Sequence, residues 1–320
     1  MIDKEIIKKF IPTCFREAAR RIRNNCLLFA KNLYKKIEGL IIDSNIYLDQ
    51  EGKSKKTLIN TTTRYKLAGI NIPITGNEKR IASLHNLHRG ERAFIIGNGP
   101  SLNLCDLTLL RDELTFGVNN IFLNYEKMGF APTYYVVEDI LLAEDRADQI
   151  NCYHGPQIKF FGNYLNYCIQ DNKDVVWLNV KTDYTNYAGF PKFSRNSARM
   201  VWVGGTVSYI CMQLAFYMGF QEVYLLGFDH SYIIPNDAKL NDQEKKITSS
   251  SDDPNHFNPG YFGKGYRWHD PNVERMEIAY LKAKENFESA DRIIYNATVG
   301  GNLEVFPRIE YKDLFLEKIK

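Results

Sequence analysis

Apolar residues from about residue 78 onward alternate between two spacings. Short uninterrupted apolar runs, each closed by glycine, asparagine or an acidic residue, are typical of parallel strands buried on both faces. They lie at 93–96, 115–118, 133–137, 158–161, 175–178, 222–226 and 292–295. Between them, helical spacing predicts a short helix at 81–87 and longer ones at 207–218, closed by Gly219, and at 271–290. This alternation predicts an α/β fold, a Rossmann-like and mostly parallel sheet with helices on both faces.

The first strand runs into a glycine-rich turn, Gly97-Asn98-Gly99-Pro100-Ser101. Pro100 and Ser101 suit a helix start, with the leucines that follow as its buried stripe. Free backbone N–H groups and a helix dipole would meet here, which predicts a site for a nucleotide phosphate. The alternative is an ordinary turn of an α/β protein, because the turn fits neither G-x-G-x-x-G nor the P-loop pattern.

Polar residues follow the predicted strands at their carboxyl ends. Open parallel sheets bind ligands at this edge, so the order of elements alone predicts a binding site there. The residues concerned are Asn98, Asn119, Glu138, Asp139, Thr206, Asp229, His230 and Asn296.

Residues 229–270 form an unusually long polar segment inside the predicted domain. The part from Lys239 to Asp253 is charged and serine-rich, whereas 257–269 sets aromatic residues among glycines. A long insertion at the ligand edge predicts a lid that covers the substrate. The alternative is a loop that its aromatic residues merely pin to the domain.

The first 75 residues have a different character from the rest. Residues 4–38 have the spacing of basic amphipathic helices, and residues 1–38 carry ten Lys/Arg against four Asp/Glu. Such helices bind anionic membrane surfaces, or pack on a domain with their basic side in solvent. Residues 40–75 predict a connector with a hairpin. We therefore divide the chain into a basic helical extension with its connector, 1–75, and an α/β catalytic domain, 76–320.

Charge and cysteine content indicate which partners and which cell compartment the sequence fits. The net charge is +3, so the residues after 38 sum to −3 and predict no basic face for nucleic acid. Six cysteines without a C-x-x-C pair fit reduced thiols, and no apolar run approaches the roughly 20 residues of a membrane span. We expect a cytoplasmic protein that is able to dock peripherally on the inner membrane, and an oligomer is compatible with this sequence.

Three histidines of the predicted lid region are candidates for chemistry: His230, His256 and His269. Together with Asp229 they make zinc conceivable, but their spacing matches no zinc signature, and we predict no metal site. A histidine near neutral pKa is the usual general base for a hydroxyl. His269 directly precedes a predicted helix, whose positive end is expected to disfavour the charged imidazole and keep it able to accept a proton.

At these residues the chain resembles a known family. The motif GNGPSL after an apolar strand, with Val118-Asn119 about twenty residues later, looks like the bacterial CMP-sialic-acid-dependent sialyltransferases. The stretch 206–229 resembles their second signature, and His269 fits their histidine before a helix. The same pieces recur in a wider superfamily of motility-accessory flagellin glycosyltransferases and 6-hydroxymethylpterin diphosphokinase-like proteins. The ending 296–308 looks more like that wider group, and the resemblance covers about residues 88–308.

The resemblance implies a variant nucleotide-sugar transferase fold with no metal and no cofactor besides a CMP-sugar donor. His269 would be the general base, and two lid tyrosines would steady the departing phosphate. One is Tyr232, beside the aligned Ser231, and the other is Tyr261 or Tyr266. The implied nucleotide-binding residues are Gly97, Asn98, Gly99, Pro100, Ser101, Asn119, Glu138, Asp139, Gly205, Thr206, Gly227 and Asp229.

The implied activity is transfer of a nonulosonic acid or related sugar from a CMP-sugar to a surface glycan or protein. Two alternatives stay open. One is a Mg²⁺-dependent, 6-hydroxymethylpterin diphosphokinase-like transfer of pyrophosphate from ATP, with Asp229, Asp139 and Glu138 as metal ligands. The other is a non-catalytic nucleotide-sugar-binding protein. Asp229-His230 departs from the purely aromatic lid of the sialyltransferases, which puts the donor sugar in question more than the nucleotide.

Overall fold

The computed structural model describes residues 46–48, 54–56, 76–181, 190–234, 239–241, 246–269 and 271–316. The basic helices predicted at 4–38 lie outside the described residues. In the connector, β1 (Ile46–Leu48) and β2 (Ser54–Lys56) pair antiparallel, as expected of a hairpin. Among the described residues, none of the helices has both the length and the apolar character needed to cross a membrane.

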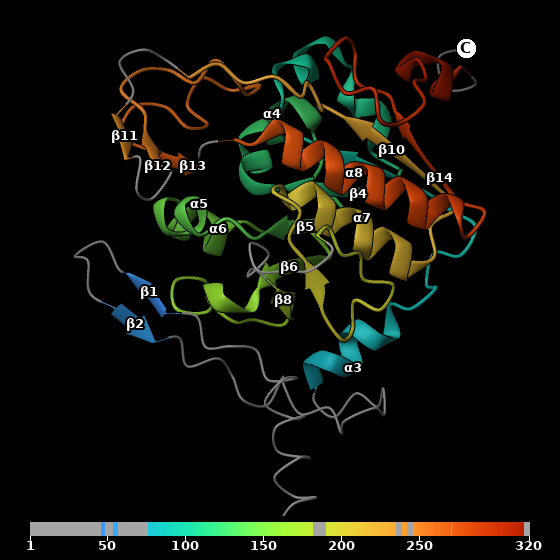
Figure 1. Cartoon of the computed structure of the whole chain (residues 1–320), viewed down its shortest axis with the longest axis horizontal. Helices are drawn as coiled ribbons and strands as arrows, with labels where there is room; N and C mark the ends of the chain where they lie inside the picture. The colour runs from blue at the N-terminus through green and yellow to red at the C-terminus, as the bar shows by residue number, and fades with distance from the viewer. Residues whose placement is uncertain are drawn as a thin grey trace, which may run out of the picture.

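A seven-stranded parallel sheet forms the centre of the described domain (Figure 1). Its strand order, β14-β10-β3-β4-β5-β6-β7, is parallel at every pairing. All seven predicted strands are present, each within one residue of its predicted bounds. They are β3 (Arg92–Ile96), β4 (Thr115–Val118), β5 (Tyr134–Val137), β6 (Ile158–Gly162), β7 (Val175–Leu178), β10 (Glu222–Leu226) and β14 (Ile293–Asn296). The α/β, Rossmann-like fold class is confirmed.

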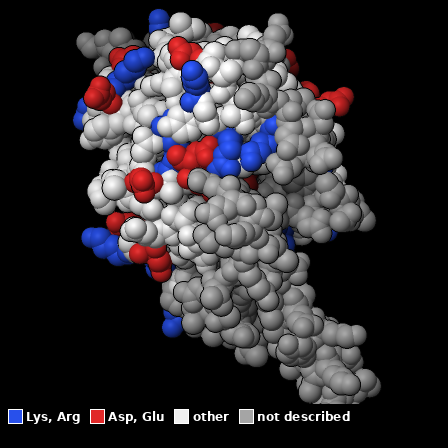
Figure 2. Space-filling model, turned by 90° about the vertical axis from the view of Figure 1, so that its left-hand side faces the viewer, with Lys and Arg blue, Asp and Glu red and all other residues white. Residues whose placement is uncertain are grey.

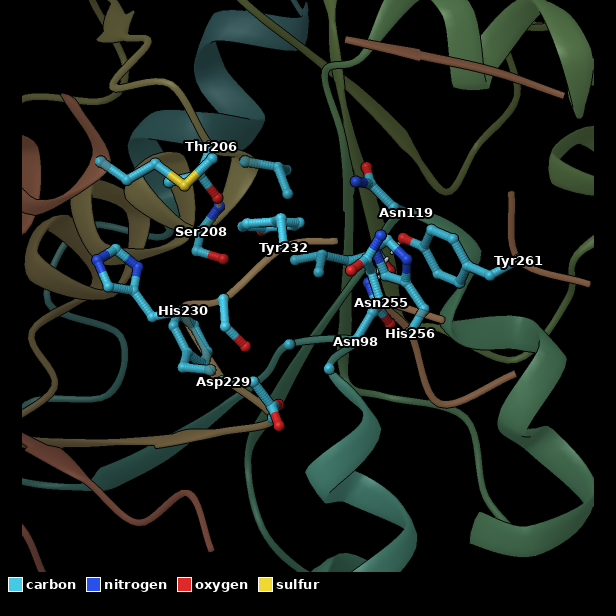
Figure 3. Close-up of a pocket in the computed structure, with 18 of the residues that line it drawn as sticks. Asn98, Asn119, Thr206, Ser208, Asp229, His230, Tyr232, Asn255, His256 and Tyr261 are labelled. Carbon is cyan, nitrogen blue, oxygen red and sulfur yellow. Dashed lines mark hydrogen bonds between the residues drawn. The ribbon is translucent and has the colours of Figure 1, made fainter. Parts of the chain in front are cut away.

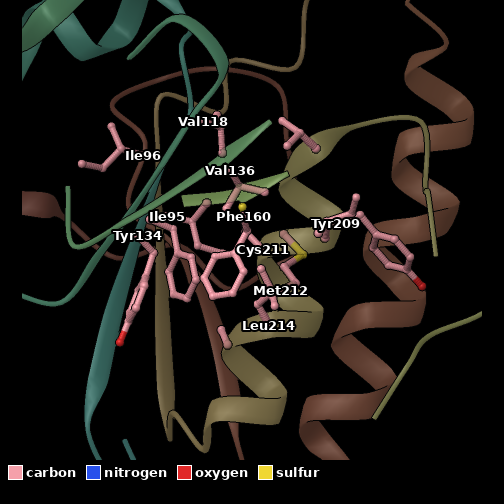
Figure 4. Close-up of a cluster of buried hydrophobic side chains, with 14 of the residues drawn as sticks. Ile95, Ile96, Val118, Tyr134, Val136, Phe160, Tyr209, Cys211, Met212 and Leu214 are labelled. Carbon is pink, nitrogen blue, oxygen red and sulfur yellow. The ribbon is translucent and has the colours of Figure 1, made fainter. Parts of the chain in front are cut away.

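Two long helices cover one face of the sheet: α7 (Val207–Met218) and α8 (Val273–Glu288). Every residue of α7 is buried, because the helix packs on β3, β4 and β5 and also against α8. Figure 4 shows Ile95, Val136 and Phe160 of the sheet gathered near Cys211, Met212 and Leu214 of α7. Gly219 ends α7 in the left-handed conformation, with φ +95°, as predicted from the sequence.

The helix predicted after the first strand is not an α-helix. The chain forms two 3₁₀ helices there, η2 (Pro100–Leu104) and η3 (Leu107–Leu110). Leu102, Leu107 and Leu110 are buried as expected, but Leu104 is 68% exposed. The extended residues Cys105 and Asp106 interrupt the segment, and the Asp106 side chain caps η3 by accepting from the Thr108 N–H.

The opposite face of the sheet is covered by short elements rather than long helices. At the C-terminal end, Phe315 of η6 (Tyr311–Phe315) stacks on Phe94 of β3.

The short helix predicted at 81–87 begins and ends earlier, as α3 (Gly76–Ser83), followed by turns. The remaining described elements are η4 (Asn119–Asn124), α4 (Tyr125–Met128), α5 (Ile140–Asp145), α6 (Ala147–Cys152), η5 (Asn163–Leu165), β8 (Val180–Lys181) and β9 (Val201–Trp202).

The predicted lid contains a small antiparallel sheet of β11 (Lys239–Asn241), β12 (Lys246–Thr248) and β13 (Arg267–His269). This sheet lies beside α5 in Figure 1. The Arg267 guanidinium forms ion pairs with Glu144 and Asp145 of α5, and the Asp145 carboxylate also accepts the Arg267 N–H at 2.9 Å. The lid segment is therefore held against the domain in this structure.

On the face seen in Figure 2, acidic and basic side chains are interspersed among the residues that are described. That face shows no extended patch of one sign.

The turns after β3 and β10 touch more closely than side chains would allow. The Gly97 N–H donates to the Leu226 carbonyl at 2.7 Å, and the Gly99 N–H donates to the Gly227 carbonyl at 3.0 Å. A Cβ at residue 97 would lie 2.6 Å from the Gly227 carbonyl oxygen. Residue 99 has φ −65°, which any residue adopts. Gly97 is therefore required by the close approach of two backbones. At residue 99 a Cβ would meet the Asp229 carboxylate at 1.8 Å as well as the Gly227 carbonyl oxygen at 2.8 Å.

We expect Gly97→Ala to lower the free energy of unfolding by about 1–3 kcal/mol, because the clash is with backbone that cannot rotate away. Urea denaturation measures this. Gly260→Ala is the matched control, since its Cβ would meet only the Asn258 side chain, at 3.3 Å. Equal stability of the two variants would contradict the close-approach explanation.

Candidate functional site

A cavity opens where β3, β4 and β10 end, as the strand order predicted. Its empty space, including the part open to solvent, is about 600 Å³. Figure 3 shows Thr206 and Ser208 on one side and Asn119, His256 and Tyr261 on the other, with Tyr232 between them. The predicted site residues that line this cavity are Gly97, Asn98, Gly99, Asn119, Thr206, Gly227, Asp229, Tyr232 and Tyr261.

The helix that presents its N-terminus to this cavity is α7. Thr206 caps it: its Oγ1 accepts the Ser208 N–H at 3.3 Å, and its carbonyl accepts the Tyr209 N–H at 3.1 Å. Val207 and Ser208 of the first turn line the cavity. The positive end of a helix dipole therefore faces the cavity, but it comes from α7 and not from the helix predicted after the first strand.

Two asparagines and a tyrosine form the opposite wall. Asn98 is buried, and its Nδ2 donates to the Val118 carbonyl at 3.0 Å and to the Tyr261 hydroxyl at 2.9 Å. Asn119 adopts φ +51°, and its carbonyl accepts from the Tyr135 hydroxyl at 2.6 Å. The Oδ1 atoms of Asn98 and Asn119 are buried without a hydrogen-bond partner among the described residues. Buried polar atoms left in this way are available to a ligand.

The Asp229 carboxylate forms hydrogen bonds within the protein and does not point to the middle of the cavity. Its carboxylate accepts from the Ser101 N–H at 3.2 Å and from the Ser101 hydroxyl at 2.7 Å. In Figure 3 it points away from Tyr232 and towards the start of η2. The carboxylate thus occupies the anion position that the sequence assigned to a nucleotide phosphate. Pro100, the first residue of η2, is exposed and lies outside the cavity.

A second cavity, with about 640 Å³ of empty space, adjoins the first. The two share Asn119, Thr206, Tyr232, His256 and Tyr261 among their lining residues. The predicted residues found only in the second cavity are Glu138, Asp139, Gly205 and His269. The structure therefore brings together every predicted site residue except Pro100, Ser101, Tyr266 and Asn296, which line neither cavity. The Asn296 side chain instead donates to the Leu303 carbonyl and accepts the Thr298 N–H.

Asp139 and His269 form a pair in the second cavity. Asp139 caps α5, with its Oδ1 accepting the Leu142 N–H at 3.1 Å, and its Oδ2 lies 3.4 Å from the His269 Nδ1. Because the Asp139 carboxylate is an acceptor, it selects the imidazole tautomer with hydrogen on Nδ1 and leaves Nε2 for a substrate proton. The His269 side chain is 52% exposed, so its ring is accessible.

The pKa of His269 moves in the direction opposite to the sequence expectation. Burial lowers it, but the hydrogen bond to Asp139 and the charges of Asp139 and Glu138 outweigh burial, so that the pKa is raised above its usual value. The sequence predicted that the positive end of a helix directly after His269 would disfavour the charged imidazole, and this prediction is wrong. The helix, α8, begins only at Val273 and is capped by Asn272. Burial raises the pKa of Asp139, yet its hydrogen bond and ion pair with His269 hold the net value below normal.

Glu138 lies beside this pair. Burial, together with the charge of Asp139, raises the pKa of Glu138 to about 7. The Tyr164 hydroxyl donates to its Oε2 at 2.9 Å, which holds the side chain in place. Glu138 and His269 are therefore neighbouring groups whose pKa values are both raised, whereas Asp139 beside them has a lowered pKa and stays ionised.

The structure separates the two tyrosine candidates. Tyr261 is buried and its hydroxyl reaches both cavities, accepting from Asn98 and, at 3.5 Å, from the Asn120 N–H. Tyr266 instead stacks under the Arg146 guanidinium, 3.8 Å from the ring centre. Tyr232 lines both cavities and is 38% exposed.

Several lining residues were not singled out from the sequence. Asn255 fixes the chain beside Tyr232, since its side chain exchanges two hydrogen bonds, at 2.7 and 2.8 Å, with the Ile233 backbone. His256, a candidate for metal binding in the sequence, lines both cavities. Lining residues that the sequence did not indicate include Ser208, Trp268, Met276 and Tyr280. An Asp253-x-x-His256 spacing is the one sequence signal that could have indicated part of this set.

The described lining of the two cavities contains few basic side chains. None of the described residues that line the two cavities is a lysine or an arginine. Within the same part of the chain, no group of three or more His, Cys, Asp or Glu side chains is placed to hold a metal ion. His230 has φ +54°, and its Nε2 is buried without a described partner. Burial lowers the pKa of His230, which favours its neutral form.

Comparisons with known proteins place the chain in a family. A family model described as 6-hydroxymethylpterin diphosphokinase MptE-like matches residues 71–235, just over half of the 320 residues. No curated protein matches the chain. Among solved structures, a MAf glycosyltransferase from Magnetospirillum magneticum AMB-1 matches at 15% identity with a TM-score of 0.43. The match covers 74% of this chain and 38% of that one, so this chain spans well under two thirds of that protein's length. The extent of the family match shows that the chain belongs to the 6-hydroxymethylpterin diphosphokinase MptE-like family.

Proposed function

We propose that the chain is a glycosyltransferase that moves a nonulosonic acid or related sugar from a CMP-sugar donor to a hydroxyl of a surface glycan or protein. One observation carries the proposal. The Asp139–His269 pair opens into the second cavity, which adjoins the first cavity with its wall of the α7 N-terminus, Asn98 and Tyr261. A base for the acceptor hydroxyl and a set of donors for a phosphate thus lie side by side.

The nature of the lining supports a donor of low charge. The described lining offers hydroxyls, amides, imidazoles and a helix N-terminus but no Lys or Arg side chain. Neutral donors stabilise an anion without a metal when they are held in place. A CMP-sugar presents a phosphodiester with a single negative charge, whereas a nucleoside triphosphate carries several and normally binds with Mg²⁺. We therefore favour the CMP-sugar.

The proposed mechanism uses this chain's own groups. The His269 Nε2 takes the proton of the acceptor hydroxyl while Asp139 holds the ring through Nδ1. The acceptor oxygen then forms a bond to the anomeric carbon of the donor, and the bond from that carbon to the phosphate oxygen breaks. The electron pair leaves on the phosphate, where the Tyr261 and Tyr232 hydroxyls are proposed to donate hydrogen bonds.

The acceptor is proposed to be assembled at the inner membrane surface. The basic segment 4–38, predicted from the sequence, would supply the attraction to anionic lipid.

A second candidate is pyrophosphate transfer from ATP to an alcohol, which membership of a 6-hydroxymethylpterin diphosphokinase MptE-like family favours. Its best structural support is the adjacent pair of carboxylates, Glu138 and Asp139, in the second cavity. Asp229, the third predicted Mg²⁺ ligand, is occupied by Ser101. This candidate requires Mg²⁺ between the phosphates.

Removing the proposed base tests its role. We expect His269→Asn to lower kcat by about 10²–10⁴-fold, the usual contribution of a general base, with little change in CMP affinity. Steady-state transfer assays with a CMP-sugar and calorimetric titration with CMP measure both. Full activity of the variant would exclude His269 as the base.

The pH profile tests the Asp139–His269 pair. A base is active when deprotonated, so activity should fall as the pH drops through the raised pKa of His269. Asp139→Asn removes the main contributions that raise that pKa, so the acid limb should move to lower pH and the maximal rate should fall. Glu138→Gln is the matched control, because it removes one nearby charge but not the hydrogen bond, and a smaller shift is expected. An unmoved limb in Asp139→Asn would contradict the pairing.

Metal dependence separates the two candidate reactions. We expect transfer from a CMP-sugar to survive EDTA, because the proposed site stabilises phosphate with neutral donors. Assays with CMP-sugars and with ATP plus a pterin alcohol, each with EDTA or with Mg²⁺, make the comparison. Mg²⁺-dependent turnover of ATP with no transfer from CMP-sugars would establish the diphosphokinase reaction instead.

A further inference from the structure

The site holds two histidine–carboxylate pairs, and the proposed mechanism uses only Asp139 with His269. The second pair is Asp253 with His256, from the lid segment. Its Nδ1–Oδ2 distance is 2.7 Å, shorter than the 3.4 Å of the first pair. The His256 side chain is 13% exposed, against 52% for His269. The second pair is thus the more tightly held of the two.

Asp253 is built into the lid as a fixed acceptor. Its side chain is 3% exposed, and its Oδ1 accepts the Asn255 N–H at 2.8 Å. Its Oδ2 accepts the Phe262 N–H at 2.9 Å as well as the His256 Nδ1. Because an ionised carboxylate only accepts, Nδ1 of His256 carries the hydrogen. A second proton on this ring can therefore reside only on Nε2.

The ring of His256 is oriented by stacking as well. It lies parallel to the Tyr261 ring, with centroids 3.9 Å apart and 1° between the planes. His256 lines both cavities, as Tyr261 does. The Nε2 atom has no hydrogen-bond partner among the described residues. A fixed ring with one free polar edge therefore lies at the junction of the two cavities.

We propose that His256 binds the phosphate of the nucleotide donor: its Nε2 takes up a proton together with the phosphate and donates it in a hydrogen bond to a phosphate oxygen. This inference rests on the proposed function. A protonated His256 would supply positive charge to the first cavity, where no described lining residue is a Lys or Arg. The Asp253 carboxylate, which accepts from Nδ1, would orient the ring and stabilise that charge.

In the proposed transfer the two histidines have different roles. As the bond from the anomeric carbon to the phosphate oxygen breaks, its electron pair stays on the phosphate, and the Nε2–H of His256 donates a hydrogen bond to it. The proton of the acceptor hydroxyl passes to Nε2 of His269. No further reactant is needed.

The test compares nucleotide with nucleoside binding in two matched variants, His256→Asn and His269→Asn. Asparagine places its Nδ2 the same number of bonds from Cα as the histidine Nδ1, so the first variant can keep the bond to Asp253 while it loses the Nε2 edge. Calorimetric titration with CMP and with cytidine is run on both variants and on the wild type, and thermal melting checks folding. We expect His256→Asn to weaken CMP at least about ten-fold and cytidine less than about two-fold. We expect His269→Asn to change neither affinity by more than about two-fold.

Each outcome decides between the inference and the proposed function. Unchanged CMP affinity in a folded His256→Asn protein overturns the inference and leaves the proposed transferase intact. Equal losses for CMP and cytidine also overturn it, because they indicate a structural role. If the wild type binds no CMP, the cytidine donor is wrong, and the same variants are compared with AMP and inorganic phosphate. If His256→Asn weakens the binding of AMP or of inorganic phosphate, His256 binds a phosphate, although the donor is not a CMP-sugar. If the variant binds both as tightly as the wild type, the inference about His256 is overturned.

Discussion

The contact between the turns after β3 and β10 determines where a ligand can bind. Gly97 and Gly99 bring one backbone against Leu226 and Gly227 of the other, and Asp229 completes the junction through Ser101. With the two strand ends locked together, the free space lies beyond β4 and at the N-terminus of α7. The glycine motif for which the sequence predicted phosphate binding therefore packs the two turns together, and the first cavity lies beside it.

Three distant parts of the chain build the site on this junction. The sheet edge contributes Asn98, Asn119 and Asp139, and α7 contributes its capped N-terminus. The segment 253–269 contributes two histidines and Tyr261, and Arg267 ties it to α5 through Glu144 and Asp145. Because Asp139 caps that same helix, the anchoring of the lid and the placing of His269 depend on one short element.

The strands and α7 could be predicted from the sequence because their apolar runs are buried on all sides, so local pattern and tertiary environment agree. Two 3₁₀ helices after β3 could not, since the extended residues Cys105 and Asp106 interrupt the segment and the leucine spacing does not indicate that break. Position along the chain predicted which residues meet at the sheet edge. It could not predict that Asp229 turns towards Ser101, that Asp139 raises the pKa of His269, or that His256 stacks on Tyr261, because these depend on side-chain direction across segments far apart in sequence.

We propose that the first cavity binds the phosphate of a nucleotide between the α7 N-terminus and Tyr261. A crystal structure of the full chain with CMP at saturating concentration would show this. We expect a phosphate within hydrogen-bond distance of the first turn of α7 and of the Tyr261 hydroxyl, with the ribose or base against Asn98 or Asn119. An empty first cavity at saturating CMP, or a nucleotide bound elsewhere on the domain, would contradict it.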